Sequence, residues 1–208
     1  MTETMTMATD YVLAILSIGL AIRLYIIAKA NRQKSVGLWA AAFLATAVSA
    51  GLGGTYHGFG NHLGTNAQAH LWQATTYVIG LMSFGMLAAA IVASVPRPLQ
   101  FWLLGLAAIK LVVYIAWMTT HHDFRYVIYD YAPSMACVLL LQVWVAYRWR
   151  EKSAGWIIGG ILVSFIAALV QQSEINLHPH FNHNDLYHLI QMGAMWMLYQ
   201  GGRSFKDR

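Results

Sequence analysis

Charged residues are scarce in this chain. Asp, Glu, Lys and Arg make up only 10% of its 208 residues, whereas 58% are hydrophobic and the mean hydropathy is +0.50. A soluble domain of this size carries far more charge, so the composition excludes an ordinary soluble protein. The sequence therefore predicts an integral membrane protein.

Cysteine and proline are also rare, with one and four residues respectively. A single cysteine excludes an internal disulfide, and Cys137, placed within an apolar run, is interpreted as filling core volume. Apolar runs long enough to cross a membrane as helices of about 20 residues follow one another with short connections. They predict an all-α, polytopic membrane protein, a seven-helix transmembrane bundle that forms a single domain over residues 1–208. The expected spans are Tyr11–Ala30, Gly37–His57, Ala69–Val92, Leu99–Thr120, Tyr126–Tyr147, Gly155–Gln172 and Asn184–Gln200.

The net charge of +5 is explained by the position of the basic residues. When the chain is threaded back and forth through seven spans, eleven Lys and Arg residues fall on one side, which the positive-inside rule makes cytoplasmic. The N-terminus is then outside, the C-terminus is inside, and nucleic acid is not an expected partner. The start of the chain lacks the features of a cleaved signal peptide, so the first span is expected to remain as an anchor of a multi-pass protein of the bacterial inner membrane or its equivalent. The eleven residues are Arg23, Lys29, Arg32, Lys34, Arg97, Arg148, Arg150, Lys152, Arg203, Lys206 and Arg208.

The same threading places all nine histidines and six of the eight acidic residues on the outer side. Wet loops alone do not explain this segregation, because the inner loops are equally wet and contain no histidine. The sequence therefore predicts a functional site at the outer ends of the helices.

Three of the spans bring a histidine to about the same outer depth. His57 ends the second span, His70 opens the third, and His188 lies near the start of the seventh, where Asn184 and Asp185 share its helix face. Three imidazoles and one water are typical of a catalytic zinc site, so Zn²⁺ is the expected cofactor. Two facing histidines on different helices also suit haem b, which is the alternative cofactor.

Three carboxylates, those of Asp130, Asp185 and Glu174, are candidates for moving a proton to and from a zinc-bound water. Asp130 is interpreted either as the partner of Arg125 or as a site residue. Lys110, near the middle of the fourth span, is expected to extend toward the inner side or to pair within the bundle. The first span is expected to carry few functional residues, and Asp10 is placed just before its outer end.

The positions of these residues resemble those of a known family. Seven spans, a histidine at the end of the second and Asn184-Asp-Leu-Tyr-His188 at the start of the seventh resemble the superfamily of alkaline ceramidases and progestin and adiponectin receptors. The resemblance implies that His57 and His188 are zinc ligands, with His183 or His70 as the candidate for the third ligand. The chain differs from the family pattern at Gly53, where the motif serine would stand, at Asn184, where the first histidine of the last helix would stand, and near His70, where the family has an aspartate.

Together these observations lead to three hypotheses. The leading one is a zinc-dependent membrane hydrolase that cleaves an amide or ester bond of a membrane lipid near the outer face. The second is a membrane electron carrier that binds haem b. The third is a metal-dependent receptor or small transporter without catalysis.

Overall fold

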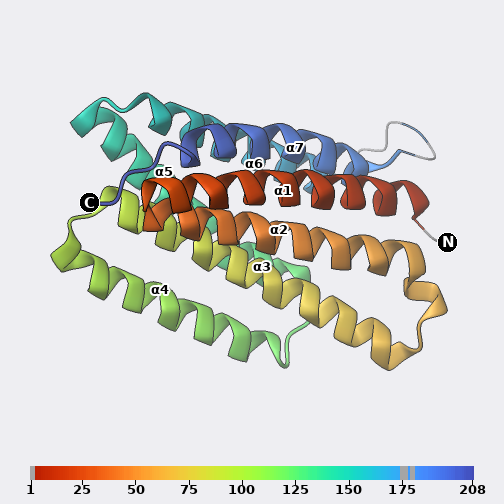
Figure 1. The fold of residues 1–208 in the computed structure, drawn as a ribbon. Helices are drawn as coiled ribbons and strands as arrows, with labels where there is room; N and C mark the ends of the chain where they lie inside the picture. The colour runs from red at the N-terminus through yellow and green to blue at the C-terminus, as the bar shows by residue number, and fades with distance from the viewer. Residues whose placement is uncertain (1–2, 174–177, 179–180) are drawn as a thin grey trace.

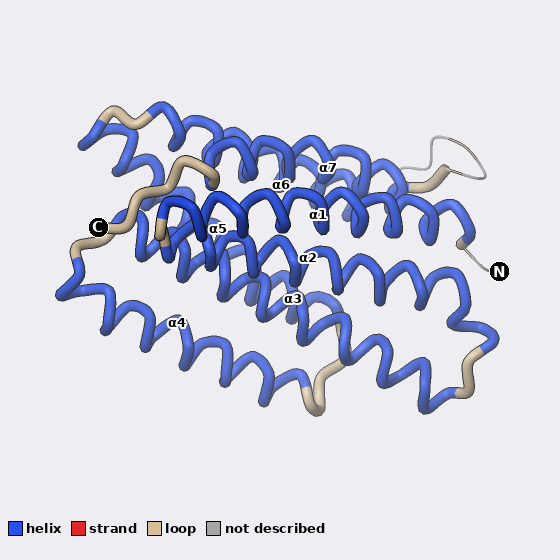
Figure 2. Tube along the Cα trace, in the orientation of Figure 1, coloured by secondary structure: helices blue, strands red, loops and turns tan. Residues whose placement is uncertain are grey.

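The structure is a computed structural model that describes residues 3–173, 178 and 181–208. These residues form seven α-helices and one short 3-10 helix, η1 (Gly60–His62), and they contain no β-strand. Figure 2 shows the helices running side by side with short connections. The helices are α1 (Thr4–Asn31), α2 (Lys34–Phe59), α3 (Thr65–Ser94), α4 (Arg97–Met118), α5 (Phe124–Trp149), α6 (Lys152–Gln172) and α7 (His183–Gly202).

Six of these helices, α1 to α6, are long and apolar enough to cross a membrane. Helix α7 is not among them, because its first turns carry the polar residues that the sequence analysis singled out. The all-helical architecture of the described residues is therefore confirmed, and the length and composition of six helices suit a membrane protein. The seven-span count and the orientation of the termini stay predictions.

Six of the helices close into a ring, and the seventh lies outside it. Helix α1 contacts α2 and α7, and the ring continues from α2 through α3, α5 and α6 back to α7. Helix α4 packs chiefly on α3, buries only Ala107, Tyr114 and Met118, and lies at the edge of the bundle (Figure 1). Most of α4 is thus exposed apolar surface, which suits contact with lipid.

The core follows α2, whose buried face is rich in small and aromatic residues. Trp39 is fully buried, donates its indole N–H to the carbonyl oxygen of Leu198 at 3.1 Å, and meets the edge of Phe205. Gly202 lies directly against the indole, since a Cβ atom there would come within 2.2 Å of the Trp39 ring. This contact fixes the end of α7 against α2.

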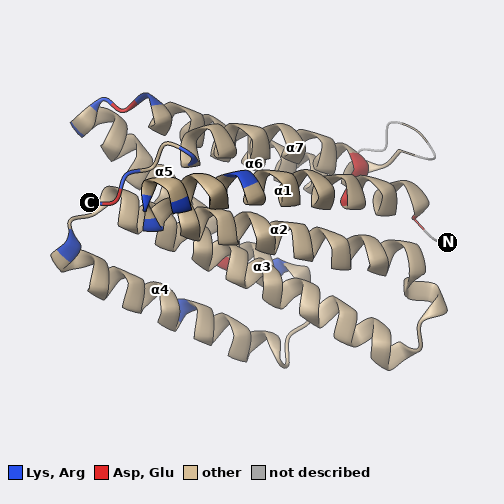
Figure 3. Ribbon diagram, in the orientation of Figure 1, with Lys and Arg blue, Asp and Glu red and all other residues tan. Residues whose placement is uncertain are grey.

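Lys and Arg gather at one end of the bundle, where the C-terminal segment also lies (Figure 3). We call this the basic end; it includes Lys29, Arg32, Lys34, Arg97, Arg148, Arg150, Lys152, Arg203, Lys206 and Arg208. The opposite end, which holds Asp10, His57, His70, Asp185 and His188, is called the histidine end. The segregation of histidine from basic residues that the sequence predicted is therefore present along the helix axes.

The segment after α7 ties the basic end together. The carboxylate of Asp207 accepts the backbone N–H groups of Lys34 (2.8 Å) and Ser35 (2.9 Å) and the Ser35 hydroxyl (2.6 Å), so it caps the N-terminus of α2. Arg208 pairs with Glu151, lies over the Trp149 ring, and its carbonyl oxygen accepts from Gln100 at 2.6 Å. The segment thereby links α2, α4 and the connection between α5 and α6.

Replacing Asp207 with asparagine should destabilise the protein in a pH-dependent way. Partial burial acts to raise the pKa of Asp207, but the hydrogen bonds from Ser35 and Lys34 outweigh it and hold the pKa below its usual value. The stabilisation is therefore complete above the unfolded pKa, about 3.9, and is lost as the pH falls through the lower folded pKa. Loss of a helix N-cap costs about 1 kcal/mol, so the unfolding midpoint of Asp207→Asn at pH 7 should lie about 2–4 °C below wild type. The difference should shrink at low pH; equal midpoints at pH 7 would show that this cap does not contribute.

Cys137 is exposed on α5, so the prediction that it fills core volume is wrong. An apolar run in a membrane helix has one face toward lipid and one toward the bundle, and hydropathy alone does not distinguish them.

Candidate functional site

A buried imidazole joins α7 to α1 at the histidine end. His188 is only 6% exposed, and both of its ring nitrogens have partners on α1. Nδ1 lies 2.9 Å from the Thr9 hydroxyl and Nε2 lies 3.1 Å from Oδ1 of Asp10. Asp10 is itself 5% exposed. The ring is therefore fixed between a hydroxyl and a carboxylate, the arrangement in which an imidazole can take up and release a proton.

Hydrogen-bond counting shows that this group of three side chains accommodates one exchangeable proton. The Thr9 hydroxyl has a single proton and lies within reach of both the Thr6 carbonyl (3.0 Å) and His188 Nδ1. If the Thr9 hydroxyl donates to the Thr6 carbonyl, His188 Nδ1 must carry a proton that it donates to the Thr9 oxygen. A second proton then lies between His188 Nε2 and the Asp10 carboxylate. If the Thr9 hydroxyl donates to Nδ1 instead, Nδ1 carries no proton and Nε2–H donates to an ionised Asp10. In this state His188 and Asp10 together hold one proton fewer. Rotation of the Thr9 hydroxyl therefore accompanies proton gain or loss.

A second carboxylate, that of Asp185, is buried at the start of α7. Its Oδ2 accepts the backbone N–H of Asn182 at 2.8 Å, and the Asn182 side chain accepts the N–H groups of Asn184 and Asp185, which completes a capping box. Asp185 is 1% exposed, and its Oδ1 has no hydrogen-bond partner among the described residues. The capping box orients this acid, and one of its oxygens stays available to a donor.

His57 lies at the same end, at the end of α2, and pairs with α1. Its Nδ1 is 2.8 Å from Oε2 of Glu3, and its carbonyl oxygen accepts the Glu3 N–H at 3.2 Å. Glu3, Thr6 and Asp10 lie on successive turns of one side of α1 or just before it, so α1 presents two carboxylates toward the histidines of α2 and α7.

Glycines on α2 allow α1 to approach this closely. A Cβ atom at Gly54 would meet Cβ of Asp10 at 2.9 Å and the Met7 carbonyl oxygen at 3.2 Å. At Gly53 the nearest atom would be Oδ2 of Asp10 at 3.5 Å, an ordinary contact. The missing side chain at Gly53 therefore leaves space beside the second oxygen of Asp10.

A family model matches residues 5–207, nearly the whole chain, and its description is "Family of unknown function (DUF6962)". The chain belongs to this family. No match was found among the curated proteins or among the solved structures. The arrangement in this DUF6962 member must therefore be interpreted from its own residues.

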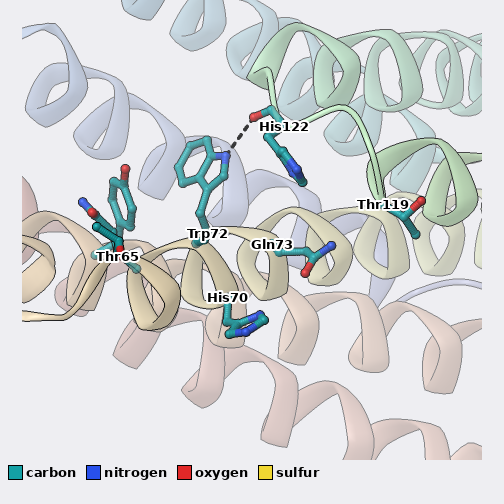
Figure 4. A pocket seen from close by; sticks show the side chains of 9 residues that line it. Thr65, His70, Trp72, Gln73, Thr119 and His122 are labelled. Carbon is teal, nitrogen blue, oxygen red and sulfur yellow. Dashed lines mark hydrogen bonds between the residues drawn. The ribbon is translucent and has the colours of Figure 1, made fainter.

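His70, the third expected ligand, is not brought to His188. It is exposed on α3 and lines a hollow of about 470 Å³ with Tyr56, Trp72, Gln73 and His122, among others. Figure 4 shows the His70 ring turned away from Trp72 and His122, while the Trp72 N–H donates to the His122 carbonyl oxygen. Within residues 3–173, 178 and 181–208, no three His, Cys, Asp or Glu side chains gather as a metal site.

The remaining predicted site residues are His183, Asp185, Glu174 and Asp130. His183 is the first residue of α7, beside the capping box, and Asp185 follows it. Glu174 lies outside the described residues. Asp130 belongs to a different site, because it is bound by Lys110.

Lys110 and Asp130 form an ion pair between α4 and α5. The Lys110 ammonium donates to Oδ1 of Asp130 at 2.6 Å and to the Ser83 hydroxyl at 3.3 Å. The Ser83 hydroxyl lies 3.0 Å from that of Ser134. Oδ2 of Asp130 is buried and has no hydrogen-bond partner in the part of the chain that the structure describes. The prediction that Lys110 pairs within the bundle is confirmed. The alternative pairing of Asp130 with Arg125 is wrong, because Arg125 binds Asp123 at the start of α5.

The sequence analysis missed Asp10, Thr9 and Glu3. It placed Asp10 at the mouth of a span beginning at Tyr11, whereas α1 begins at Thr4 and carries Asp10 nearly two turns into the helix. Asp10 therefore lies within a helix and is buried, whereas the sequence placed it just before a span. A signal was present, since Thr6, Thr9 and Asp10 recur at the spacing of one helix face.

Proposed function

We propose that the protein is an integral-membrane hydrolase that cleaves an amide or ester bond of a lipid, with Asp10 and His188 as its acid–base pair. The observation that carries this proposal is the buried His188 ring held between the Thr9 hydroxyl and the Asp10 carboxylate. A general base in hydrolysis must lie close to the attacking water, accept a proton from it, and later transfer that proton to the leaving group. The depth of the site within the apolar helices favours a lipid substrate.

In this proposal Asp10 is the general base. Its Oδ2 lies beside Gly53, where no side chain fills the space, and a water there can donate to it. As the water oxygen bonds to the substrate carbonyl carbon, its proton passes to Asp10 and is shared with His188 Nε2. The same proton then goes to the departing nitrogen or oxygen when the carbon–nitrogen or carbon–oxygen bond breaks. His188 stabilises the proton between these two steps, and Thr9 follows it by rotation.

Zinc remains part of the proposal as a testable cofactor. His57 and His188 supply imidazoles and Glu3 and Asp10 supply carboxylates at the same end of the bundle, and zinc accepts both donor types. These side chains form two separate pairs, and among the described residues no three of them gather around one point. When bound, zinc would make a coordinated water more acidic. The steps assigned to Asp10 and His188 do not depend on it.

The experiment is a lipid turnover assay on the purified protein in detergent. A panel of amide-linked and ester-linked lipids is incubated with wild type, Asp10→Asn, His188→Gln and the control His70→Gln, and released fatty acid is measured by mass spectrometry. Wild type and His70→Gln should cleave one lipid class, whereas the other two variants should be at least about 100-fold slower. Unfolding midpoints show that each variant is folded.

Zinc content is measured by elemental analysis on the same preparations. The proposal expects His57→Gln and His188→Gln to lose any bound zinc and His70→Gln to retain it. The hydrolase proposal would be abandoned if no lipid were cleaved, or if Asp10→Asn were as active as wild type.

A proton-coupled transporter is the second candidate, and the Lys110–Asp130 pair favours it. Ionisable pairs within a membrane bundle are typical of proton and substrate pathways. The described residues include one such pair between α1 and α7 and one between α4 and α5. Proton uptake into vesicles containing the protein, in the absence of lipid turnover, would support this candidate.

A further inference from the structure

A hollow at the basic end is lined by cations on one side and by apolar side chains on the other. Its volume is about 390 Å³, and it lies where the C-terminal segment meets α2 and the start of α4. Lys34, Arg97 and Arg208 supply the charge, and Phe101 and Leu104 supply the apolar wall; Val92, Gln100 and Asp207 complete the lining. We propose that this hollow binds the phosphate headgroup of an anionic phospholipid, with an acyl chain along α4.

Two of the three cations are available for a ligand. Arg208 is already bound to Glu151 and lies over Trp149. Lys34 and Arg97 are exposed, and neither forms an ion pair with a residue in the described part of the chain. A phosphate between them would gain two charge-assisted contacts.

Asp207 is the single acidic side chain in the lining, and its repulsion of a bound phosphate is reduced. Its two oxygens accept three hydrogen bonds from the first turn of α2, so its charge is compensated locally. The Gln100 side chain is also engaged, since its amide group donates to the carbonyl oxygens of Val95 and Arg208. These contacts build the wall of the hollow and leave its charged side to Lys34 and Arg97.

The apolar wall favours a lipid over a free phosphate. Phe101 is 75% exposed, and the surface continues along α4 through Trp102, Leu106 and Ile109, which are each more than 60% exposed. A headgroup at Arg97 would therefore place its acyl chain along a continuous apolar face, whereas inorganic phosphate would leave that face unused. Basic pockets between helices at the membrane surface are suited to such headgroups.

The test uses the full chain in neutral detergent with added lipid, and native mass spectrometry measures binding. Phosphatidylglycerol should bind more tightly than phosphatidylcholine and should raise the unfolding midpoint. The double variant Lys34→Gln/Arg97→Gln should bind phosphatidylglycerol about 30-fold more weakly. Lys29→Gln, which removes an exposed charge of the basic end outside the hollow, should bind like wild type, and Arg97→Lys should retain most of the affinity.

Three outcomes of the lipid-binding measurements would overturn the proposal. These are equal affinity for the two lipids, unchanged binding in the double variant, and an equal loss in Lys29→Gln. Inorganic phosphate is tested separately without lipid; if it alone produced the full rise in the unfolding midpoint, the hollow would be a free-phosphate site and the lipid assignment would be wrong. None of these residues belongs to the Asp10–His188 site, so the result does not depend on the hydrolase proposal.

Discussion

Replacing Lys110 with methionine is expected to lower the free energy of unfolding by about 3–5 kcal/mol. The Asp130 side chain is 5% exposed, and one of its oxygens already lacks a partner. Methionine would remove the 2.6 Å contact to the other oxygen and leave a buried carboxylate unpaired. Because α4 packs chiefly on α3, the variant should also loosen α4 from α5.

The reverse variant should cost less. The Lys110 side chain is 32% exposed and flexible, so in Asp130→Asn its ammonium can bind the amide oxygen or extend along α4 toward the membrane surface. The double variant Lys110→Met/Asp130→Asn should recover part of the loss, because it removes both charges together. Thermal and denaturant unfolding in detergent measures all three.

Arg125→Met is the control for the Lys110 series. Its ion pair with Asp123 is solvent-exposed, and such pairs contribute about 0–1 kcal/mol. If Lys110→Met were no more destabilising than Arg125→Met, the pair between α4 and α5 would not be part of the folded state in the membrane.

Replacing Gly54 with valine is expected to separate α1 from α2 and to disrupt the Asp10–His188 pair. Even the Cβ atom would lie 2.9 Å from Cβ of Asp10 and 3.2 Å from the Met7 backbone oxygen, and neither atom belongs to a flexible side-chain end. Overpacking of this kind costs about 1–3 kcal/mol, or more where backbone must move. Unfolding midpoints measure the destabilisation, and the lipid assay should show lost turnover.

Gly51→Val is the matched control on the same helix. A Cβ atom at Gly51 meets nothing within 4 Å, so this variant changes helix propensity without a clash. Its midpoint and turnover should remain close to wild type. Equal effects of the two substitutions would contradict the close approach of α1 at Gly54.

The helices of this protein could be predicted because hydropathy and helix length are properties of local sequence. Each expected span overlaps one observed helix, and the histidines lie toward one end as expected. The helix ends were less predictable. The expected first span began at Tyr11, whereas α1 begins at Thr4. Because of this difference, the sequence placed Asp10 before the helix and not within it.

The partners of the ionisable residues could be predicted only in part. That Lys110 needs a partner followed from the cost of an unpaired lysine in an apolar helix. The identity of that partner could not be predicted. Arg125 is closer to Asp130 in sequence, but Arg125 binds Asp123, and Lys110 on α4 binds Asp130 on α5. His70 lies near the start of α3, as expected, but on an exposed face, because position along a helix does not determine direction around it.

The sequence by itself determined that this is a helical membrane protein with histidines at one end and basic residues at the other. Those features depend on how many apolar or charged side chains follow one another along the chain. Only the tertiary structure decided that His188 meets Asp10 and Thr9, that His57 meets Glu3, and that Asp130 meets Lys110. Such contacts depend on the rotation and spacing of neighbouring helices, which Gly54 helps to set where α1 approaches α2.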